Sequence, residues 1–356
     1  MNQNTNNIDL VKKILITGGA GYIGNELIKA LPQSIEIIVV DNFHIDTPHK
    51  RSINKELGKD RKLTLIECNV SEINKHKELL TNIDIVIYMA SLNVYKESNA
   101  NPLLYLIQNN INLQIFLDVL KQHSPNIKKF ILTSSRGVYG EGPYLCNNCH
   151  NRIYPPLSEQ LKCTLCLSKE VSAENIKETD IPNPSSYYGI TKKIQEDLIS
   201  MYCSANKILL DVFRIFNVYG EDQGKYYSSI GIIPQIYEQI TKNKEMYLSG
   251  NGNITRDFVY VGDIVKILED SIFSKNKRRN KKEIYNLGSG QSISINDLAN
   301  FFEGLGYEFK KNSLKEFGDI KYSVADNSKI SKEFNVKFTD IYSFLVNTYK
   351  KIKHLQ

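Results

Sequence analysis

The amino-acid sequence predicts an α/β protein, in which a doubly wound parallel sheet is followed by a smaller carboxyl-terminal lobe. Two observations support this fold class. Short apolar runs alternate with longer helical patterns from residue 13 to about residue 210, and a glycine-rich turn joins the first apolar run to the first helical pattern. The chain has 356 residues, of which 41% are hydrophobic, so it can bury the core of one large domain or of two modest ones.

The strands of the predicted sheet are apolar runs of the kind that parallel sheets bury on both faces. They lie at residues 14–16, 37–40, 63–67, 83–89, 129–133 and 208–213. Helices are predicted at residues 22–31, 103–122 and 190–201. From about residue 217 the chain is expected to build the smaller lobe, to return to the sheet at 258–273, and to end in the lobe from residue 283.

The glycine-rich turn reads Thr-Gly-Gly-Ala-Gly-Tyr-Ile-Gly from Thr17 to Gly24. Glycine allows a tight turn and lets the backbone approach a pyrophosphate, while the free N–H groups of the following helix N-terminus point at the phosphates. The second strand ends in Asp41, whose carboxylate can accept the ribose hydroxyls of NAD and would repel the 2′-phosphate of NADP. A glycine turn alone could simply join a strand to a helix, but together with Asp41 it predicts a Rossmann-like domain that binds NAD.

Three polar residues follow at the expected end of the sheet. Tyr188 and Lys192 are four residues apart at the start of a predicted helix, so their side chains project from one face. A free tyrosine has a pKa of about 10, and a neighbouring ammonium would favour the phenolate. Ser135 follows the strand at 129–133, at the carboxyl edge where open α/β sheets bind ligands. The alternative is a tyrosine and a lysine on a solvated helix face, which the position of Ser135 disfavours.

Four of the six cysteines form two Cys-x-x-Cys pairs, Cys146 with Cys149 and Cys163 with Cys166. Each turn can aim two thiolates at one ion, so the pattern predicts a tetrahedral structural zinc site in a zinc-ribbon-like insertion at 141–180. Two disulfides are one alternative. Haem attachment at Cys-Asn-Asn-Cys-His is another, although it leaves the second pair unexplained. Four thiolates leave no open coordination position, so we expect the zinc to fold the insertion rather than to take part in a reaction.

Six segments together resemble the signatures of extended short-chain dehydrogenases/reductases that act on nucleotide sugars. They read Gly-Gly-Ala-Gly-Tyr-Ile-Gly from Gly18, Ser-Arg-Gly-Val-Tyr-Gly from Ser135, Tyr-Gly-Ile-Thr-Lys from Tyr188, Arg-Ile-Phe-Asn-Val-Tyr-Gly from Arg214, Arg-Asp-Phe-Val-Tyr-Val from Arg256 and Tyr-Asn-Leu-Gly from Tyr285. The resemblance covers residues 13–329. Within the family, Ser-Ser-Arg before Val-Tyr-Gly-Glu-Gly-Pro-Tyr and the four-cysteine insertion are similar to dTDP-L-rhamnose 4-epimerases and related nucleotide-sugar 4-epimerases.

The resemblance implies a transient oxidation of the sugar at C4. Tyr188 would take the proton from the sugar hydroxyl, Ser135 would orient that oxygen, and Lys192 would hold the nicotinamide ribose and tune Tyr188. The keto-sugar would then turn over and receive the hydride on its other face, so NAD would stay bound. A reductase or dehydrogenase that releases NAD(P) would use the same three residues and is the alternative. A non-catalytic dinucleotide sensor or zinc-ribbon binding protein would not need them together.

The ligand contacts follow from the same resemblance. The residues expected to bind NAD are Gly18, Gly21, Tyr22, Ile23, Gly24, Asp41, Asn42, Asn69, Val70, Ala90, Tyr188 and Lys192. The residues expected to bind a dTDP- or UDP-linked sugar are Ser135, Arg136, Asn217 and Arg256. Where related dehydratases carry an Asp-Glu pair, this chain has Arg136 and Gly137, which disfavours dehydration. Lys-Glu-Phe precedes Gly318 where many relatives have a diphosphate-binding arginine, so the phosphate clamp departs from the family pattern.

The expected domain organisation has an NAD-binding domain and a substrate lobe. The first spans 11–216, with the insertion at 141–180 and a return segment at 258–275, and the second spans 217–257 and 283–356. We also expect a homodimer, in which the helix at 103–122 and the helix of Tyr188 pair with their copies. Leu104, Ile107, Ile111 and Ile115 recur there at helical spacing, although such a stripe could equally pack on its own sheet.

Composition predicts a cytoplasmic enzyme with neither nucleic acid nor membrane as a partner. The net charge of +6 is mild, and most of it lies in a basic run at 275–282, which is typical of a solvated loop. The sequence contains no apolar run of about eighteen residues, and its first residues are polar rather than a signal peptide. Paired thiols without a secretion signal favour a reducing compartment.

Overall fold

The computed structural model describes residues 11–44, 61–155, 161–221, 223, 231–241, 246–249, 252–274, 281–307, 309–312 and 320–353. The chain divides into two compact units. Unit 1 comprises Met1–Ser135, Ser186–Arg214 and Val261–Tyr285, and unit 2 comprises Arg136–Ser185, Ile215–Tyr260 and Asn286–Gln356. Each unit is therefore assembled from three separate segments of the chain.

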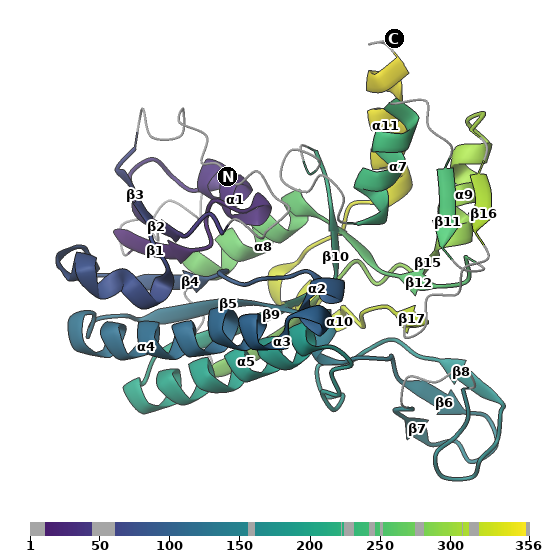
Figure 1. Cartoon of the computed structure of the whole chain (residues 1–356), viewed down its shortest axis with the longest axis horizontal. Helices are drawn as coiled ribbons and strands as arrows, with labels where there is room; N and C mark the ends of the chain where they lie inside the picture. Colours follow the sequence, from purple (N-terminus) through teal and green to yellow (C-terminus); the bar gives the residue numbers. More distant parts are fainter. Residues whose placement is uncertain are drawn as a thin grey trace. The chain divides into compact units, whose positions relative to one another are not determined.

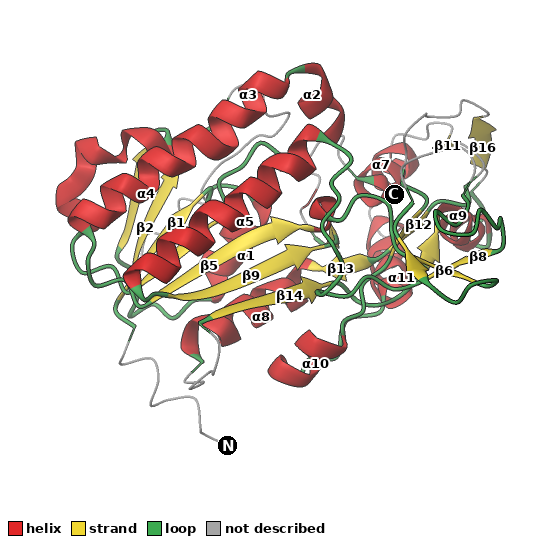
Figure 2. Cartoon of the chain, turned by 90° about the horizontal axis from the view of Figure 1, so that it is seen from below, coloured by secondary structure: helices red, strands yellow, loops and turns green. Residues whose placement is uncertain are grey.

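Unit 1 is built around a seven-stranded sheet (Figure 2). Its strands, in spatial order, are β14 (Lys282–Leu287), β9 (Leu209–Ile215), β5 (Lys129–Ser135), β4 (Ile85–Tyr88), β1 (Lys13–Thr17), β2 (Glu36–Asp41) and β3 (Leu63–Glu67). Pairing is parallel between β1 and β2, β1 and β4, β2 and β3, and β4 and β5. The strand order reverses between β1 and β4, so the sheet is doubly wound, as the sequence predicts. Ligands of open α/β sheets bind at such a reversal.

Helices cover both faces of this sheet (Figures 1 and 2). They are α1 (Tyr22–Ala30), the 3₁₀ segment η3 (Val70–Leu80), α2 (Tyr95–Ala100), α3 (Pro102–Leu106), the π-helical turn η4 (Ile107–Ile111), α4 (Asn112–His123), α5 (Tyr187–Asn206) and α8 (Val261–Phe273). Helix α1 contacts α8 on one face, whereas α4 and α5 lie on the other. Leu113, Phe116 and Leu120 of α4 pack in one buried cluster with Phe130 of β5.

The single helix predicted at 103–122 forms as three consecutive pieces, α3, η4 and α4. The π-helical spacing in η4 is rare, and such turns inside α-helices are frequent at functional sites. Ile107, Ile111 and Ile115 are exposed by 40%, 56% and 41%, so these members of the predicted stripe do not pack on the sheet of unit 1. Leu104 is partly buried.

Unit 2 contains short strands and four helices among the residues that the structure describes. The strands are β10 (Asn217–Tyr219) with β13 (Phe258–Tyr260), β11 (Met246–Ser249) with β16 (Phe309–Asn312), and the trio β15 (Ile293–Ser294), β12 (Thr255–Arg256) and β17 (Tyr322–Ser323). The helices are α7 (Ile232–Thr241), α9 (Ile295–Glu303), α10 (Ser328–Phe334) and α11 (Ile341–Lys353). Their core gathers Tyr219, Phe258, Phe302 and Phe344.

The cysteine-bearing insertion belongs to unit 2. The 3₁₀ turn η5 (Arg136–Val138) leads into an antiparallel sheet of β7 (Arg152–Ile153), β6 (Tyr144–Cys146) and β8 (Val171–Ala173). The buried carboxylate of Glu141 accepts the backbone N–H groups of Lys321 and Tyr322 at 2.9 and 3.2 Å. The insertion is thereby fastened to β17, whose Ser323 pairs with Arg256 of β12.

Two predicted segments lie partly or wholly outside the described residues. They are the basic run, of which only residues 281 and 282 are described, and the departure from the phosphate-clamp pattern at 315–319. Among the helices that are described, none combines the length and the apolar character needed to cross a membrane.

Candidate active site and cysteine cluster

The glycine-rich turn forms between β1 and α1, as predicted. Gly18 has a φ of +69°, and a Cβ atom built there would lie 2.7 Å from the backbone nitrogen of Ala90, so both the conformation and the space require glycine. A Cβ at Gly24 would lie 2.5 Å from the carbonyl oxygen of Gly19. Helix α1 therefore packs directly on the turn. Gly21 is its N-cap and supplies no capping side chain.

Asp41 ends β2 and is 98% buried, with 2% of its surface exposed. Its Oδ2 accepts the N–H of Ala20 at 3.1 Å and its Oδ1 accepts the N–H of Phe43 at 3.0 Å. These bonds hold the Asp41 side chain beside the glycine turn. Another polar residue of this region, Asn69, caps η3, and its side chain accepts the N–H of Ser71 at 3.2 Å.

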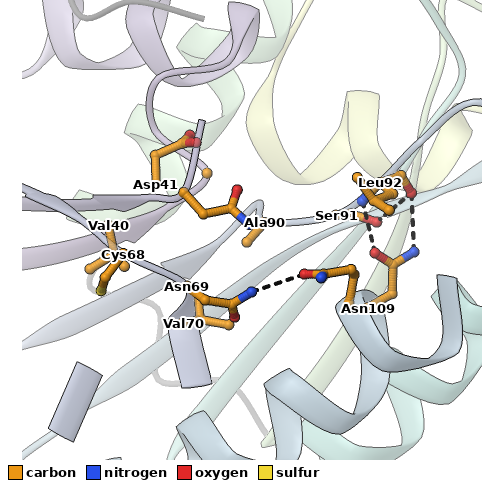
Figure 3. Close-up of a pocket in the computed structure, with 12 residues that line it drawn as sticks. Val40, Asp41, Cys68, Asn69, Val70, Ala90, Ser91, Leu92 and Asn109 are labelled. Atoms are coloured by element: carbon orange, nitrogen blue, oxygen red, sulfur yellow. Dashed lines mark hydrogen bonds between the residues drawn. The ribbon is translucent and has the colours of Figure 1, made fainter. Parts of the chain in front are cut away.

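One pocket joins the ends of β1, β2, β3 and β4 (Figure 3). Six residues expected to bind the dinucleotide line it, namely Gly18, Asp41, Asn42, Asn69, Val70 and Ala90. The remaining members of the motif, Gly21, Tyr22, Ile23 and Gly24, form the start of α1, and the Tyr22 side chain is buried.

The sequence did not single out six further lining residues as members of a site, namely Val40, Cys68, Ser91, Leu92, Gln108 and Asn109. The first four lie at the end of a predicted strand or within three residues after it, and that position was an available signal. Gln108 and Asn109 lie on the π-turn η4, for which the sequence gives no local signature. Gln108 accepts a bond from the Asn69 side chain at 2.9 Å, as Figure 3 shows.

Asn109 is fully buried and connects three elements. Its Oδ1 accepts the N–H of Leu92 at 2.8 Å, and its Nδ2 donates to the carbonyl of Leu92 at 3.0 Å and to the Thr191 hydroxyl at 2.9 Å (Figure 3 draws the first two). The neighbouring Asn110 donates to the backbone carbonyl of Thr191 at 2.9 Å. The π-turn therefore ties the pocket to helix α5, since Thr191 lies between Tyr188 and Lys192.

Ser135, Tyr188 and Lys192 all belong to unit 1. Ser135 is the last residue of β5, and Tyr188 and Lys192 lie on the first turns of α5, where Ser186 is the N-cap and accepts the N–H of Gly189 at 3.0 Å. The Lys192 ammonium is buried and donates to Oε1 of Gln195 at 2.7 Å. Burial lowers the pKa of Lys192 to about 7, against the opposing effect of the Glu196 carboxylate.

The other residues expected to bind substrate belong to unit 2 and each make a local backbone contact there. Arg136 donates to the carbonyl of Gly140 at 2.9 Å, and Asn217 to that of Asp257 at 2.9 Å. Arg256 donates to the carbonyl of Ile320 at 2.6 Å. All three side chains are partly buried.

The four cysteines of the insertion converge. The sulfur atoms of Cys146, Cys149, Cys163 and Cys166 all lie within 4.8 Å of one another. Cys146 and Cys166 are 3.5 Å apart, and Cys149 and Cys163 are 3.6 Å apart, well beyond the disulfide bond length of about 2.05 Å. The predicted pairs of Cys-x-x-Cys turns thus form one cluster.

Backbone amides point at two of the sulfur atoms in this cluster. The N–H groups of Leu165 and Cys166 both point at Cys163 Sγ at 3.4 Å, and the N–H of Cys149 points at Cys146 Sγ at 3.5 Å. Hydrogen bonds from Asn151 lower the pKa of the Cys149 thiol to about 6. A set of four convergent sulfur ligands with such donors is suited to a tetrahedral ion such as Zn²⁺.

Comparisons with known proteins agree with this geometry. The sequence profile described as "NAD dependent epimerase/dehydratase family" matches residues 14–288. The chain is 28% identical over 334 residues to dTDP-L-rhamnose 4-epimerase of Burkholderia thailandensis, covering 89% of this chain and 88% of that protein. It is 30% identical over 295 residues to dTDP-D-glucose 4,6-dehydratase of Dictyostelium discoideum, covering 81% and 61%. The structure of UDP-glucuronic acid 4-epimerase from Bacillus cereus with UDP-glucuronic acid and NAD superposes with a TM-score of 0.77 at 25% identity, covering 97% and 100%.

Proposed function

The chain belongs to the NAD dependent epimerase/dehydratase family, and on that premise we propose that it is an NAD-dependent nucleotide-sugar 4-epimerase. The observation that carries the proposal is the position of Ser135, Tyr188 and Lys192, which lie in the same unit as the pocket at the strand reversal. The relatives include a dehydratase, but elimination of water needs an acidic pair that this chain replaces with Arg136 and Gly137. Epimerisation needs no such pair.

The residues at the strand reversal fit NAD. The close approach of Gly18 to Ala90 keeps the turn free of side chains where a diphosphate would pass, and Asp41 supplies a carboxylate for the ribose hydroxyls. When bound, NAD accepts a hydride from the sugar carbon and returns it. Because the cofactor ends each turnover in its starting state, it need not be released.

The chain's own residues move the proton. Tyr188 takes the proton from the sugar C4 hydroxyl as a phenolate and returns it after the sugar has turned over. Ser135 donates a hydrogen bond that orients the same oxygen. The Lys192 ammonium favours the phenolate and binds the nicotinamide ribose. Asn217, Arg256 and Arg136 bind the nucleotide and diphosphate of a dTDP- or UDP-linked sugar.

A direct experiment tests this proposal. The purified protein is denatured, and the released small molecule is identified by mass spectrometry. The untreated protein is then incubated with UDP- and dTDP-hexoses without added cofactor, and the C4 configuration is followed by NMR. We expect NAD and catalytic interconversion of the two C4 epimers. A requirement for stoichiometric NAD(P)H would instead identify a net reductase, and absence of any dinucleotide would contradict the proposal.

The cysteine cluster is proposed to hold one structural zinc ion. The buried apolar residues around it are few, and two of the four buried members of that cluster are themselves cysteines. Ordering the insertion therefore requires free energy from a bound ion. Reduced thiols are required, which fits a cytoplasmic protein. Elemental analysis is expected to give about one zinc per chain.

A homodimer is proposed through the exposed face of α3, η4 and α4. Leu103 is exposed by 68% and continues the row of Ile107, Ile111 and Ile115, and Met201 of α5 is exposed by 73%. An apolar row of this length marks an interaction site. Analytical ultracentrifugation should give a dimer for the wild type and a monomer for Ile111→Glu, while Lys121→Glu stays dimeric. A monomeric wild type at micromolar concentration would refute the dimer.

A further inference from the structure

A buried network of three side chains lies beside the catalytic residues and has no part in the mechanism above. The Glu196 carboxylate accepts the Ser134 hydroxyl at 2.6 Å, Nε of Arg214 at 2.9 Å and Nη2 of Arg214 at 2.7 Å. Their exposed fractions are only 4%, 2% and 3% for Ser134, Glu196 and Arg214. A buried ion pair adds little to stability, because desolvation of both charges offsets their attraction. The network therefore needs another explanation than stability alone.

Its position provides one. Glu196 lies one helical turn after Lys192, and two turns after Tyr188, so the three side chains share a face of α5. Ser134 immediately precedes Ser135 at the end of β5, and Arg214 lies near the end of the adjacent strand β9. Glu196 thus joins the helix that carries the proposed base to the strand that carries the proposed serine.

We propose that Glu196 is a positioning residue that fixes helix α5 against the carboxyl end of β5, so that Ser135 and Tyr188 meet the same substrate oxygen. The bidentate contact with Arg214 holds the carboxylate in one orientation, and the hydroxyl of Ser134 transmits that orientation to β5. This role rests on the proposed function, because it presumes that the three residues act on one oxygen.

The charge of Glu196 has a second effect on the same face. Lys192 is buried, and its ammonium has the neutral amide of Gln195 as its hydrogen-bond acceptor. Glu196 interacts electrostatically with Lys192 and pairs with the Arg214 guanidinium of β9, while the Tyr188 phenol on α5 interacts with the Tyr105 phenol on α3. Glu196 is the anion among them that raises the pKa of Lys192. Neutralising it would disfavour the Lys192 ammonium further.

The test compares two neighbouring carboxylates on α5. Glu196→Gln keeps the shape and an acceptor oxygen but removes the charge. Asp197→Asn removes the charge of the next residue, which is exposed and pairs with Lys193 at 2.6 Å. We expect Glu196→Gln to lower kcat by roughly 10- to 100-fold with little change in KM, because misplacement of reacting groups acts on the chemical step. In a plot of kcat against pH, the alkaline limb of this variant should move to a pH that is lower by about one unit. Asp197→Asn should match the wild type in both.

A wild-type kcat and pH profile in Glu196→Gln would overturn the proposal, and so would a lowered kcat with an unmoved profile. If Glu196→Gln does not fold, Ser134→Ala removes only the tether to β5 and should lower kcat several-fold without moving the profile. Amide hydrogen exchange distinguishes a failure of the positioning role of Glu196 from a failure of the proposed function. Glu196→Gln should speed exchange at residues 133–135 and 187–192 relative to Asp197→Asn, whether or not any nucleotide sugar is epimerised.

Discussion

Helix α5 and the four-cysteine insertion bury polar groups for opposite reasons. Around α5, Lys192, Gln195 and Glu196 are buried beside the extensive apolar cluster that α4, α5 and the sheet form together. In the insertion, the buried cluster consists of Tyr144, Ile153 and two of the cysteines themselves. The first region has enough apolar packing to tolerate polar groups that chemistry requires. The insertion has so little apolar packing that its stability must come from its polar groups.

The contrast predicts that the reaction depends on unit 1 alone for its proton transfer. Tyr188→Phe should lower kcat by about 10²–10⁴-fold, because general base catalysis is lost while the shape of the side chain is kept. Binding of NAD, measured by calorimetry on NAD-free protein, should be nearly unchanged. Ser135→Ala should cost less than Tyr188→Phe, since it removes one hydrogen bond. Near-normal turnover of Tyr188→Phe on the true substrate would overturn the assignment.

Cofactor choice should depend on one carboxylate in the same unit. In the proposed function Asp41 faces the ribose, where its negative charge would repel a 2′-phosphate, so NAD should bind at least about 10-fold more tightly than NADP. Asp41→Asn should reduce the ratio of the NAD affinity to the NADP affinity, while it keeps an acceptor oxygen near the N–H groups of Ala20 and Phe43. Equal wild-type affinities for both dinucleotides would show that Asp41 does not face the ribose.

Loss of one thiol should affect unit 2 and spare the pocket. Cys163→Ser should reduce zinc content, expose the insertion to protease and lower activity several-fold, because Glu141 and Tyr322 connect the insertion to the strand beside Arg256. NAD affinity should survive. Cys203→Ser is the matched control, since that cysteine is buried in unit 1 outside the cluster. An insertion that resists protease in metal-free, reduced protein would refute the role of the ion.

The smallest expected change is one in stability, and it has the opposite sign. Lys192→Met keeps the apolar stem of the side chain and removes a buried ammonium, so it should abolish activity yet raise Tm of the NAD-free protein by roughly 2–8 °C, corresponding to about 1–2 kcal/mol. Differential scanning calorimetry measures the change. A lowered Tm of the variant would show that Lys192 stabilises unit 1 rather than destabilising it.

The difference in stability between the wild type and Lys192→Met should depend on pH, because the pKa of Lys192 is lowered in the folded protein. The folded protein releases the proton near pH 7, whereas the unfolded chain keeps it to about pH 10.5. Between these pH values the unfolded state binds more protons than the folded state. The free energy of unfolding of the wild type therefore increases as the pH rises. The stability advantage of Lys192→Met should therefore be largest near or below pH 7 and shrink toward pH 10. An advantage independent of pH would contradict the linkage.

Local patterns explain what the sequence predicts well. The apolar runs give six of the seven strands of the sheet, and they miss β14 (Lys282–Leu287), which was predicted to lie almost wholly in the smaller lobe. The glycine turn and Asp41 give one edge of the pocket, and the two Cys-x-x-Cys turns give the cluster, because each signal is contained in a few consecutive residues. The π-turn η4 and the polar contacts of Asn109 and Glu196 were not predicted. Their partners lie 62 residues away for Ser134 with Glu196 and 82 residues away for Asn109 with Thr191, so only the assembled sheet brings them together.

The π-turn also governs the shape of the outer surface. Four residues of an α-helix advance by about 400°, so a row of side chains spaced by four winds around the axis by about 40° at each step. The wider turn at Ile107–Ile111 takes one more residue to complete a revolution, and it cancels part of that winding midway along the row. Leu103, Ile107, Ile111 and Ile115 are exposed, and we expect them to form a straighter ridge than a regular helix would give. A straight ridge can lie along its own copy related by a two-fold axis, whereas a winding one would diverge from it after two turns.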